Sequence, residues 1–278
     1  MSLSEVAIAG LFCHPVKALG AAPLATADIT PAGLVDDRRW MVVDTRIRPA
    51  RAVTQRELAT LAAIRVERAD AAWRLIAPDG TASTLRTLQG GQDARRYRVR
   101  LWSREWDAID AGDATAEWLA HATGMRGTEL RIVECAPAGA TEANRLSSFV
   151  DDAALLITSA PSLAALNAAL YGGRGGRLPM DRFRPNIVLS GLVPWEEDHL
   201  AEIRIGTVRL RLTAPCVRCE VTATDQTSGQ RSGEEPLITL SRLRSDPDRG
   251  GATFGWYAIP ETPGRLALGQ PAEVIHRF

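Results

Sequence analysis

Lysine is almost absent from this chain: among 33 basic residues, only Lys17 is a lysine and the rest are arginine. Neither charge is in excess, because 33 acidic residues bring the formal net charge to zero. Nucleic-acid-binding domains usually carry a basic excess, so the composition argues against that function. A balanced total does not exclude a local basic pocket for an anionic ligand. Lysine and arginine are not equivalent donors, so Lys17 is a candidate functional residue.

Long apolar runs and clustered cysteines are also missing. The apolar stretch Val6–Cys13 is short and lacks a basic leader, so it predicts neither a secretory signal nor a membrane span, and we expect a cytoplasmic protein. Only two of the four cysteines, Cys216 and Cys219, lie close together. Because a cytoplasmic compartment keeps thiols reduced, we expect no disulfide scaffold. A metal ligand, a catalytic thiol and plain core residues remain as interpretations.

Short apolar segments separated by glycine, proline and aspartate predict a β-rich α+β fold with a few helices. We expect strands at Val6–Phe12, Trp40–Asp44, Ala62–Val66, Trp73–Ile76, Arg96–Trp102, Glu129–Glu134, Ala153–Ile157, Asn186–Ser190, Ala201–Ile205, Thr207–Leu212, Glu220–Thr224 and within Arg265–Val274. We expect helices at Ala114–Thr123, Ser159–Leu170 and Pro236–Arg244. A change of character near residues 125–140 divides the chain into domains 1–128 and 129–278.

The segment Pro215–Cys219 has a Cys-x-x-Cys spacing. A structural zinc site would need two more ligands, and the sequence offers no second pair of cysteines or histidines nearby. A thioredoxin-like pair would begin a helix, whereas residues that favour strands follow here. A single Cys219 thiolate beside Arg218 suits a soft metal, because a neighbouring cation lowers a thiol pKa. Two buried core cysteines are the open alternative.

Several cations stand at expected strand ends and turns. Arg184 and Asn186 lead into an apolar strand, where a guanidinium would match a phosphate and an amide would match ring donors and acceptors. A solvated loop with surface ion pairs is the alternative. Lys17, Arg38 and Arg56 occupy similar positions in the first third of the chain. If these residues converge, they form a basic pocket inside a neutral protein. No Ser/His/Asp set, P-loop or dinucleotide motif is present.

Taken in order, these segments resemble the MOSC family, and within it the members that carry a MOSC N-terminal β-barrel domain, which are relatives of the mitochondrial amidoxime-reducing component. The matching segments are His14–Leu19, Gly33–Leu34, Asp37–Asp44, Thr54–Arg56, Phe183–Asn186, Pro215–Cys219, Asp225–Gly229, Glu235–Leu237 and Phe254–Gly255. The resemblance implies a MOSC domain with a barrel like that of pyruvate kinase, packed against an N-terminal β-barrel domain.

The resemblance also implies a molybdenum cofactor, molybdenum bound to molybdopterin, between the two domains. By motif, Cys219 is its protein ligand to molybdenum and the catalytic residue. The implied cofactor-binding residues are Lys17, Arg38, Arg56, Arg184, Asn186, Arg218 and Cys219. Ala18 and Asp152 depart from the family pattern, which often has hydroxyl residues there. Since a carboxylate is unfavourable beside a phosphate, Asp152 should point elsewhere or the binding mode should differ.

The function implied is a molybdenum-dependent oxidoreductase that reduces N-hydroxylated small molecules, namely hydroxylamines, amidoximes and N-hydroxylated bases. The chain has no clustered cysteines for an iron–sulfur centre. We therefore expect a separate electron-donor protein, ferredoxin-like or a cytochrome or flavoprotein, and neither nucleic-acid nor membrane partners. The alternative is a carrier of cofactor or persulfide sulfur without reductase activity, in which Cys216 could resolve a persulfide. A third is a binding module without metal.

Overall fold

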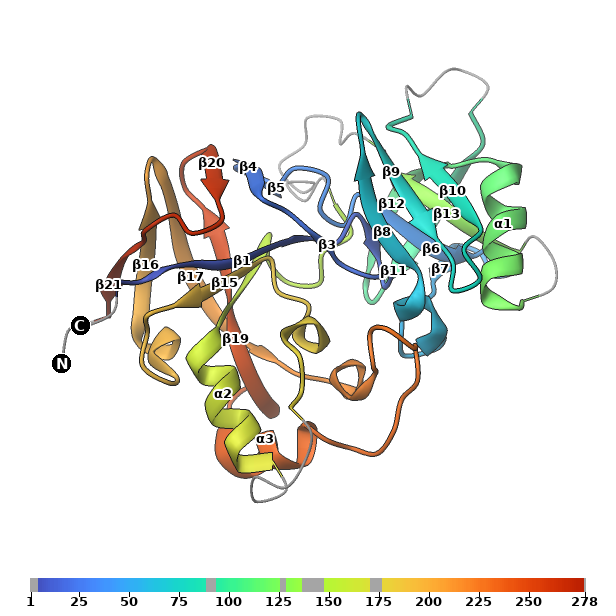
Figure 1. Ribbon diagram of the computed structural model, residues 1–278. Coiled ribbons are helices and arrows are strands. Elements are labelled where there is room, and N and C mark those ends of the chain that lie inside the picture. Colours follow the sequence, from blue (N-terminus) through green and yellow to red (C-terminus); the bar gives the residue numbers. More distant parts are fainter. Residues whose placement is uncertain (1–4, 89–93, 126–128, 137–147, 171–176, 278) are drawn as a thin grey trace.

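The computed structural model describes residues 5–88, 94–125, 129–136, 148–170 and 177–277. A closed barrel lies on one side of the molecule (Figure 1). It is formed by β6 (Trp40–Asp44), β7 (Ala50–Ala52), β11 (Arg96–Leu101), β12 (Arg104–Asp110) and β13 (Leu130–Cys135), and it closes because β13 pairs with both β12 and β6. Further elements of this side are β2 (Val16–Lys17), the sheet of β8 (Arg65–Ala69), β9 (Ala72–Ile76) and β10 (Ala82–Leu85), and α1 (Asp113–Thr123).

A nine-stranded sheet forms the other side. Its main path runs β21-β16-β17-β19-β14-β15-β1-β3, and β18 pairs with β19. The strands are β1 (Ala7–Cys13), β3 (Ala22–Pro23), β14 (Leu155–Ser159), β15 (Ile187–Ser190), β16 (Leu200–Ile205), β17 (Val208–Val217), β18 (Ser245–Asp246), β19 (Gly251–Pro260) and β21 (Glu273–His276). A small sheet joins β4 (Thr26–Thr30), β5 (Gly33–Leu34) and β20 (Gly264–Ala267), and the helices α2 (Ala160–Ala169) and α3 (Leu237–Arg244) lie on this side as well.

The predicted β-rich α+β class, with an N-terminal barrel packed against a second β domain, is confirmed. The strand at Trp40–Asp44 and the three helices were placed to within about one residue of their observed ends. Two strand predictions were wrong. Glu220–Ala223 is a 3₁₀ turn, η6, because Thr222 donates from both its amide and its hydroxyl to the Cys219 carbonyl.

The segment predicted as a strand at Ala62–Val66 is divided between two elements. Its first part belongs to a second 3₁₀ turn, η1 (Ala59–Ala63), and β8 begins only at Arg65. Short-range bonds from Leu61 to Leu58 and from Ile64 to Leu61 hold the turn. Leu61, Ala62 and Ala63 are buried in this turn, although their apolar character had favoured a strand. Two further 3₁₀ turns, η4 (Met180–Phe183) and η5 (Glu196–His199), lie on the side of the nine-stranded sheet.

Strand pairing crosses the predicted division at residues 128 and 129 in both directions. The N-terminal strand β1 pairs with β15 of the nine-stranded sheet. The strand β13, which follows the division, completes the barrel by pairing with β6. Residues 126–128 themselves lie outside the described part of the chain. The domain limits stay a prediction, and the two β units are joined by exchanged strands.

The strand β6 separates two apolar cores, which explains its continuous run of apolar residues. Successive side chains of a strand point to opposite faces. Trp40 and Val42 belong to the large core shared with the nine-stranded sheet, whereas Met41 and Val43 belong to the core inside the barrel. All four side chains are buried. One face of β6 therefore packs inside the barrel, and the other face packs in the core shared with the nine-stranded sheet.

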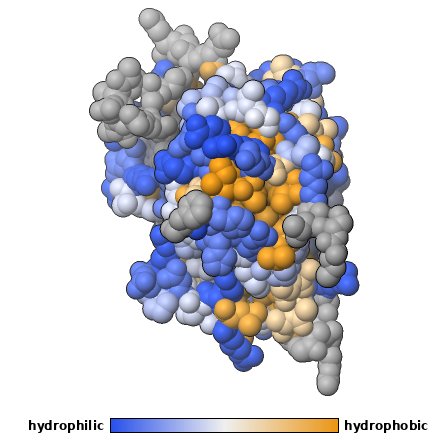
Figure 2. All heavy atoms as spheres, turned by 90° about the vertical axis from the view of Figure 1, so that its left-hand side faces the viewer, coloured by the Kyte–Doolittle hydropathy of each residue, from blue (hydrophilic) through white to orange (hydrophobic). Residues whose placement is uncertain are grey.

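Figure 2 shows the face of the molecule at the edge where β16 and β21 lie. Apolar side chains gather in the middle of this face and polar ones surround them (Figure 2). Among the described residues, no helix has the length and apolar character needed to span a bilayer.

Gly255, in the matched Phe254–Gly255 segment, allows a close approach of β19 to β14. Its φ is +76°, and an added Cβ would lie 2.7 Å from the Ile157 carbonyl oxygen. We expect Gly255→Ala to lower the free energy of unfolding by about 3 kcal/mol, because strain and a backbone clash add. Gly250→Ala is the matched control: its φ is +71° but a Cβ there meets open space, so strain alone should cost about 1 kcal/mol. Urea unfolding measures both, and equal losses would contradict the clash.

Candidate functional site

A cavity of about 400 Å³ lies between the barrel and the nine-stranded sheet. All seven predicted site residues line it: Lys17, Arg38, Arg56, Arg184, Asn186, Arg218 and Cys219. The barrel side contributes β2 and the turns before β6, after β7 and between β11 and β12, whereas the other side contributes the ends of η4 and β17. The seven predicted residues come from five of these places and converge on one cavity, although their roles as cofactor ligands stay predictions.

The two neighbouring cysteines differ in environment. Cys216 lies in β17 and is buried, whereas Cys219 precedes the 3₁₀ turn η6 and is half-buried. Both line the cavity. Cys219 therefore presents the more accessible sulfur. The part of the chain that the structure describes holds no group of three or more His, Cys, Asp or Glu residues arranged to bind a metal ion.

Arg218 is next to Cys219 in the sequence, but its guanidinium contacts Cys216 instead. Arg218 directly follows β17 and donates from Nη1 to Cys216 Sγ at 2.9 Å. Its Nη2 donates to the Phe183 carbonyl at 2.8 Å, and its buried Nε has no partner in the described residues. The hydrogen bond of Arg218 to a cysteine is thus made to Cys216, and its effect on the Cys219 thiol stays a prediction.

Arg56 is the cation beside Cys219. Burial acts to lower the pKa of Arg56, but hydrogen bonding to Cys219 and the charges of Cys219, Asp151 and Glu220 outweigh it, and the net shift is upward. The guanidinium also lies over the ring of Trp102, 4.4 Å from the ring centroid. Arg56 therefore links the barrel to the exposed sulfur.

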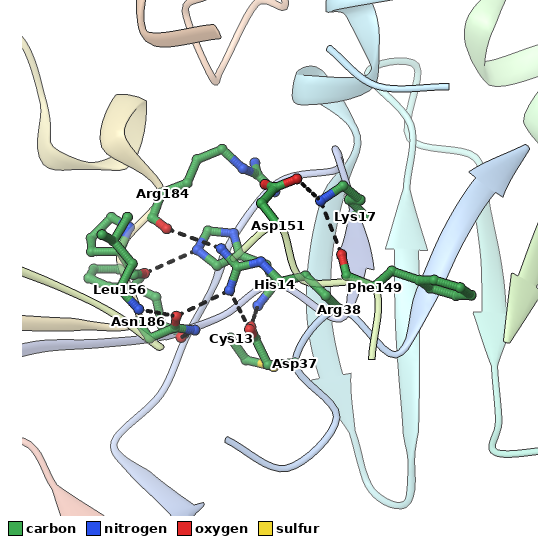
Figure 3. Close-up of polar contacts among 12 residues, drawn as sticks. Cys13, His14, Lys17, Asp37, Arg38, Phe149, Asp151, Leu156, Arg184 and Asn186 are labelled. Atoms are coloured by element: carbon green, nitrogen blue, oxygen red, sulfur yellow. Dashed lines mark hydrogen bonds and ion pairs between the residues drawn. The ribbon is translucent and has the colours of Figure 1, made fainter. Parts of the chain in front are cut away.

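Lys17 is anchored by two oxygens at the cavity wall. Its Nζ donates to the Phe149 carbonyl at 3.0 Å and to Asp151 Oδ1 at 2.8 Å (Figure 3). Burial lowers the pKa of Lys17, and the charge of Asp151 offsets part of that effect. Burial would raise the pKa of Asp151, but the Lys17 charge and the hydrogen bonds from Lys17 and Trp102 lower it to about 2. The pair is thus charged at neutral pH.

Arg38 is the second deep cation. It forms a short salt bridge with Asp37, donates to Asn186 Oδ1 at 3.1 Å and donates to the Arg184 carbonyl at 3.3 Å (Figure 3). Asn186 is fully buried, and its amide also accepts from the Leu156 amide and donates to the Phe12 carbonyl. Its oxygen is therefore already engaged in holding Arg38 and the sheet together. The predicted contact of Asn186 with a cofactor stays a prediction.

Arg184 is the least compensated cation. Burial and the charge of Arg38 lower its pKa to about 9, because the charges of Asp37 and Asp151 offset only part of these effects. Its Nη1 donates to the Leu19 carbonyl at 2.7 Å and to Gln226 at 3.2 Å. Burial is the largest of these effects, and the neighbouring cations add to it, so a bound anion would stabilise the charged form of Arg184.

The backbone around this cavity is strained at two of the cations, Arg38 and Arg184, and at Ala18, which follows Lys17. Ala18, Arg38 and Arg184 have φ values of 75°, 48° and 53°, in the left-handed region that residues with a Cβ rarely adopt. Ala18 replaces the hydroxyl residue of the family pattern. Such strain persists only where the surrounding structure enforces it, and it concentrates at functional sites. The rest of the fold thus holds these residues in conformations that lower its own stability.

Sequence reasoning missed other residues of the cavity wall. Asp151, which balances Lys17, was overlooked in favour of its neighbour Asp152, which also lines the cavity and is exposed. Trp102, Gln55 and Tyr257 were missed because no motif marks them. Burial raises the pKa of Tyr257, so its phenol keeps its proton. One signal could have pointed to Asp151: a buried lysine needs a carboxylate partner, and Lys17 is the only lysine of the chain.

Comparison with known proteins adds to this geometry. Residues 5–126 match the MOSC N-terminal beta barrel domain, and residues 144–273 match the MOSC domain. The chain belongs to the MOSC family. The human mitochondrial amidoxime-reducing component 1 is 28% identical to this MOSC chain, over 96% of the chain and 82% of the relative.

This MOSC chain is also similar to a longer relative and to a solved structure. The molybdenum cofactor sulfurase of Drosophila grimshawi is 30% identical over 95% of the chain, which covers 34% of that longer protein. The crystal structure of the YuaD protein of Bacillus subtilis matches over 99% of the chain and 97% of its own, at 11% identity and a TM-score of 0.43. Relatives of this MOSC chain therefore include proteins named for amidoxime reduction and for molybdenum cofactor sulfuration.

Asp151→Asn tests how the carboxylate stabilises the protein through Lys17. The folded pKa lies below the unfolded one, so the carboxylate stabilises the fold above about pH 4, and this contribution is lost as the pH falls towards 2. The side chain is 50% exposed, and screening limits the effect to about 1 kcal/mol. We expect urea unfolding to show this deficit at pH 7 and convergence with the wild type at acid pH.

The matched control for this experiment is Asp152→Asn, which removes the adjacent exposed carboxylate. It should leave stability at pH 7 within about 0.5 kcal/mol of the wild type. A deficit in Asp151→Asn that persists unchanged at the lowest pH would contradict the ion-pair account.

Proposed function

We propose that this protein is a molybdenum-cofactor-dependent oxidoreductase that reduces N-hydroxylated substrates such as hydroxylamines, amidoximes and N-hydroxylated bases to amines. The observation that carries the proposal is the cavity that the half-buried Cys219 lines together with several cations, of which Arg184 is the least compensated. Membership of the MOSC family and the relative named for amidoxime reduction support it.

The cavity residues fit an anionic pterin that carries a metal. A thiolate is a soft ligand, and Cys219 is the more exposed of the two cavity cysteines. Arg184, Lys17 and Arg38 would bind phosphate and other anionic groups, since their charges exceed those of the carboxylates beside them. The buried Nε of Arg218, which has no partner among the described residues, is a further donor for such a ligand.

Reduction of an N-hydroxylated amine uses two electrons and two protons, breaks the N–O bond and releases the amine and water. When bound, the molybdenum cofactor supplies a metal able to accept two electrons and pass them on. The residues of this chain would hold and orient it: the cations would neutralise its charge, and Cys219 would provide a sulfur ligand. The protonated Tyr257 phenol is a hydrogen-bond donor at the cavity wall.

The electrons must come from outside the described chain. We propose a separate electron-donor protein, ferredoxin-like or a cytochrome or flavoprotein, and a cytoplasmic location for the reaction. The substrate would be a small molecule, because the cavity volume of about 400 Å³ is within the range of small-molecule sites.

A second candidate is a carrier of cofactor or persulfide sulfur that performs no reduction. The observation in its favour is Cys216, whose sulfur lines the same cavity as that of Cys219. The relative named molybdenum cofactor sulfurase also agrees with it. The buried position of Cys216 and its hydrogen bond from Arg218 favour a structural role for this thiol instead.

The two cysteines allow a matched experiment on metal binding. The wild type and each cysteine-to-alanine variant would be purified from a host that synthesises the molybdenum cofactor, and the metals would be measured by mass spectrometry. We expect near-stoichiometric molybdenum in the wild type, at least a tenfold loss in Cys219→Ala, and retention of most of the metal in Cys216→Ala. The physical reason is that Cys219 is the more exposed of the two cysteines, whereas Cys216 is buried and accepts a hydrogen bond from Arg218.

Activity with a chemical reductant separates the two candidate functions. Turnover of hydroxylamine by the wild type supports the reductase, whereas bound molybdenum without turnover favours the carrier. Wild-type protein free of molybdenum would contradict both, and zinc that depends on both cysteines would point to a metal site of another kind.

A further inference from the structure

Trp102 stands at the mouth of the cavity in a conformation that the fold enforces. It lies in the turn between β11 and β12 with a φ of 56°, and its side chain is 48% exposed. Its indole nitrogen donates to Asp151 Oδ1 at 2.8 Å. A large ring that lines the cavity, is held in a strained turn and is fixed by a hydrogen bond is positioned to contact a ligand there.

Arg56 adds a positive charge to this surface. Its guanidinium lies over the Trp102 ring and beside Cys219. Two carboxylates act on it, but both are engaged with other cations: Asp151 pairs with Lys17 at 2.8 Å, and Glu220 pairs with Arg231 at 2.8 Å. Among the described residues, no salt bridge neutralises Arg56 directly. The approach to the Cys219 sulfur therefore passes an aromatic face and a cation.

The reduction of an amidoxime changes the charge of the molecule. An N-hydroxylated amidine is a weak base and is neutral near pH 7, whereas the amidine product is a strong base and is protonated there. A fixed cation close to the reacting position repels the charged product and leaves the neutral substrate unaffected to first order. A conjugated amidoxime is also flat, so an aromatic side chain can stack on it.

We propose that Trp102 and Arg56 form the substrate-recognition wall of this site: Trp102 stacks on planar N-hydroxylated substrates, and Arg56 selects the neutral substrate over its cationic product. This inference rests on the proposed reductase function and extends it to a substrate class. It makes Arg56 a residue of substrate selection rather than a cofactor ligand, and it gives the barrel a part in specificity. Asp152, exposed on the same cavity wall, acts in the opposite sense by attracting the product.

The test is the affinity of the purified protein for benzamidoxime and for benzamidine, measured by isothermal titration calorimetry. Trp102→Ala should weaken benzamidoxime binding about tenfold, and Trp102→Phe should restore most of it because a ring remains. Arg56→Gln should tighten benzamidine binding about fivefold and change benzamidoxime binding by less than about twofold. Arg98 is an exposed arginine of β11 that pairs with Glu105. Arg98→Gln is the control and should bind both ligands as tightly as the wild type.

Each result separates this inference from the proposed function. Reduction of hydroxylamine by the wild type reports the function alone, because that substrate has no ring to stack. Trp102-dependent binding of benzamidoxime without any reduction would support the recognition wall and contradict the reductase. Unchanged benzamidoxime affinity in Trp102→Ala would overturn the wall. Loss of molybdenum in Arg56→Gln would assign Arg56 to the cofactor and overturn its role in selection.

Discussion

The crowding of buried cations around one cavity is the constraint on which the rest of the site depends. Burial and, after it, the charge of Arg38 lower the pKa of Arg184 to about 9, although Asp37 and Asp151 supply some negative charge. An anion bound beside these cations would offset part of the cost of burying them. The hydrogen bonds of Lys17 and Arg38 hold their charged groups in place.

The cavity owes its shape to the exchange of strands between two β units. The strand β1 extends the nine-stranded sheet, and β13 closes the barrel, so neither unit is built from one continuous part of the chain. The residues that follow β1 and precede β6 are forced into tight turns, where Ala18 and Arg38 take left-handed conformations. Strain and charge are therefore concentrated where the units meet, and the sulfur of Cys219 faces that junction.

Most of the fold and the convergence of the cations could be predicted from the sequence, because strand patterns and the order of the motifs are visible in it. It could not place Asp151 against Lys17, since their separation of 134 residues leaves no local signal. Adjacency suggested that Arg218 serves Cys219, whereas its guanidinium hydrogen-bonds to Cys216. Thr222 had favoured a strand, but its bonds to Cys219 make a 3₁₀ turn. These two contacts span only two and three residues, but the direction of each side chain could not be read from residue type alone.

The central claim is that Cys219 is the protein ligand of a molybdenum centre in this cavity. X-ray absorption at the molybdenum edge tests it most directly, with the wild type compared with Cys219→Ser and Cys216→Ser. The account predicts one sulfur ligand fewer in Cys219→Ser, or loss of the metal, and an unchanged spectrum in Cys216→Ser. The same sulfur coordination in the wild type and in metal-loaded Cys219→Ser would contradict it.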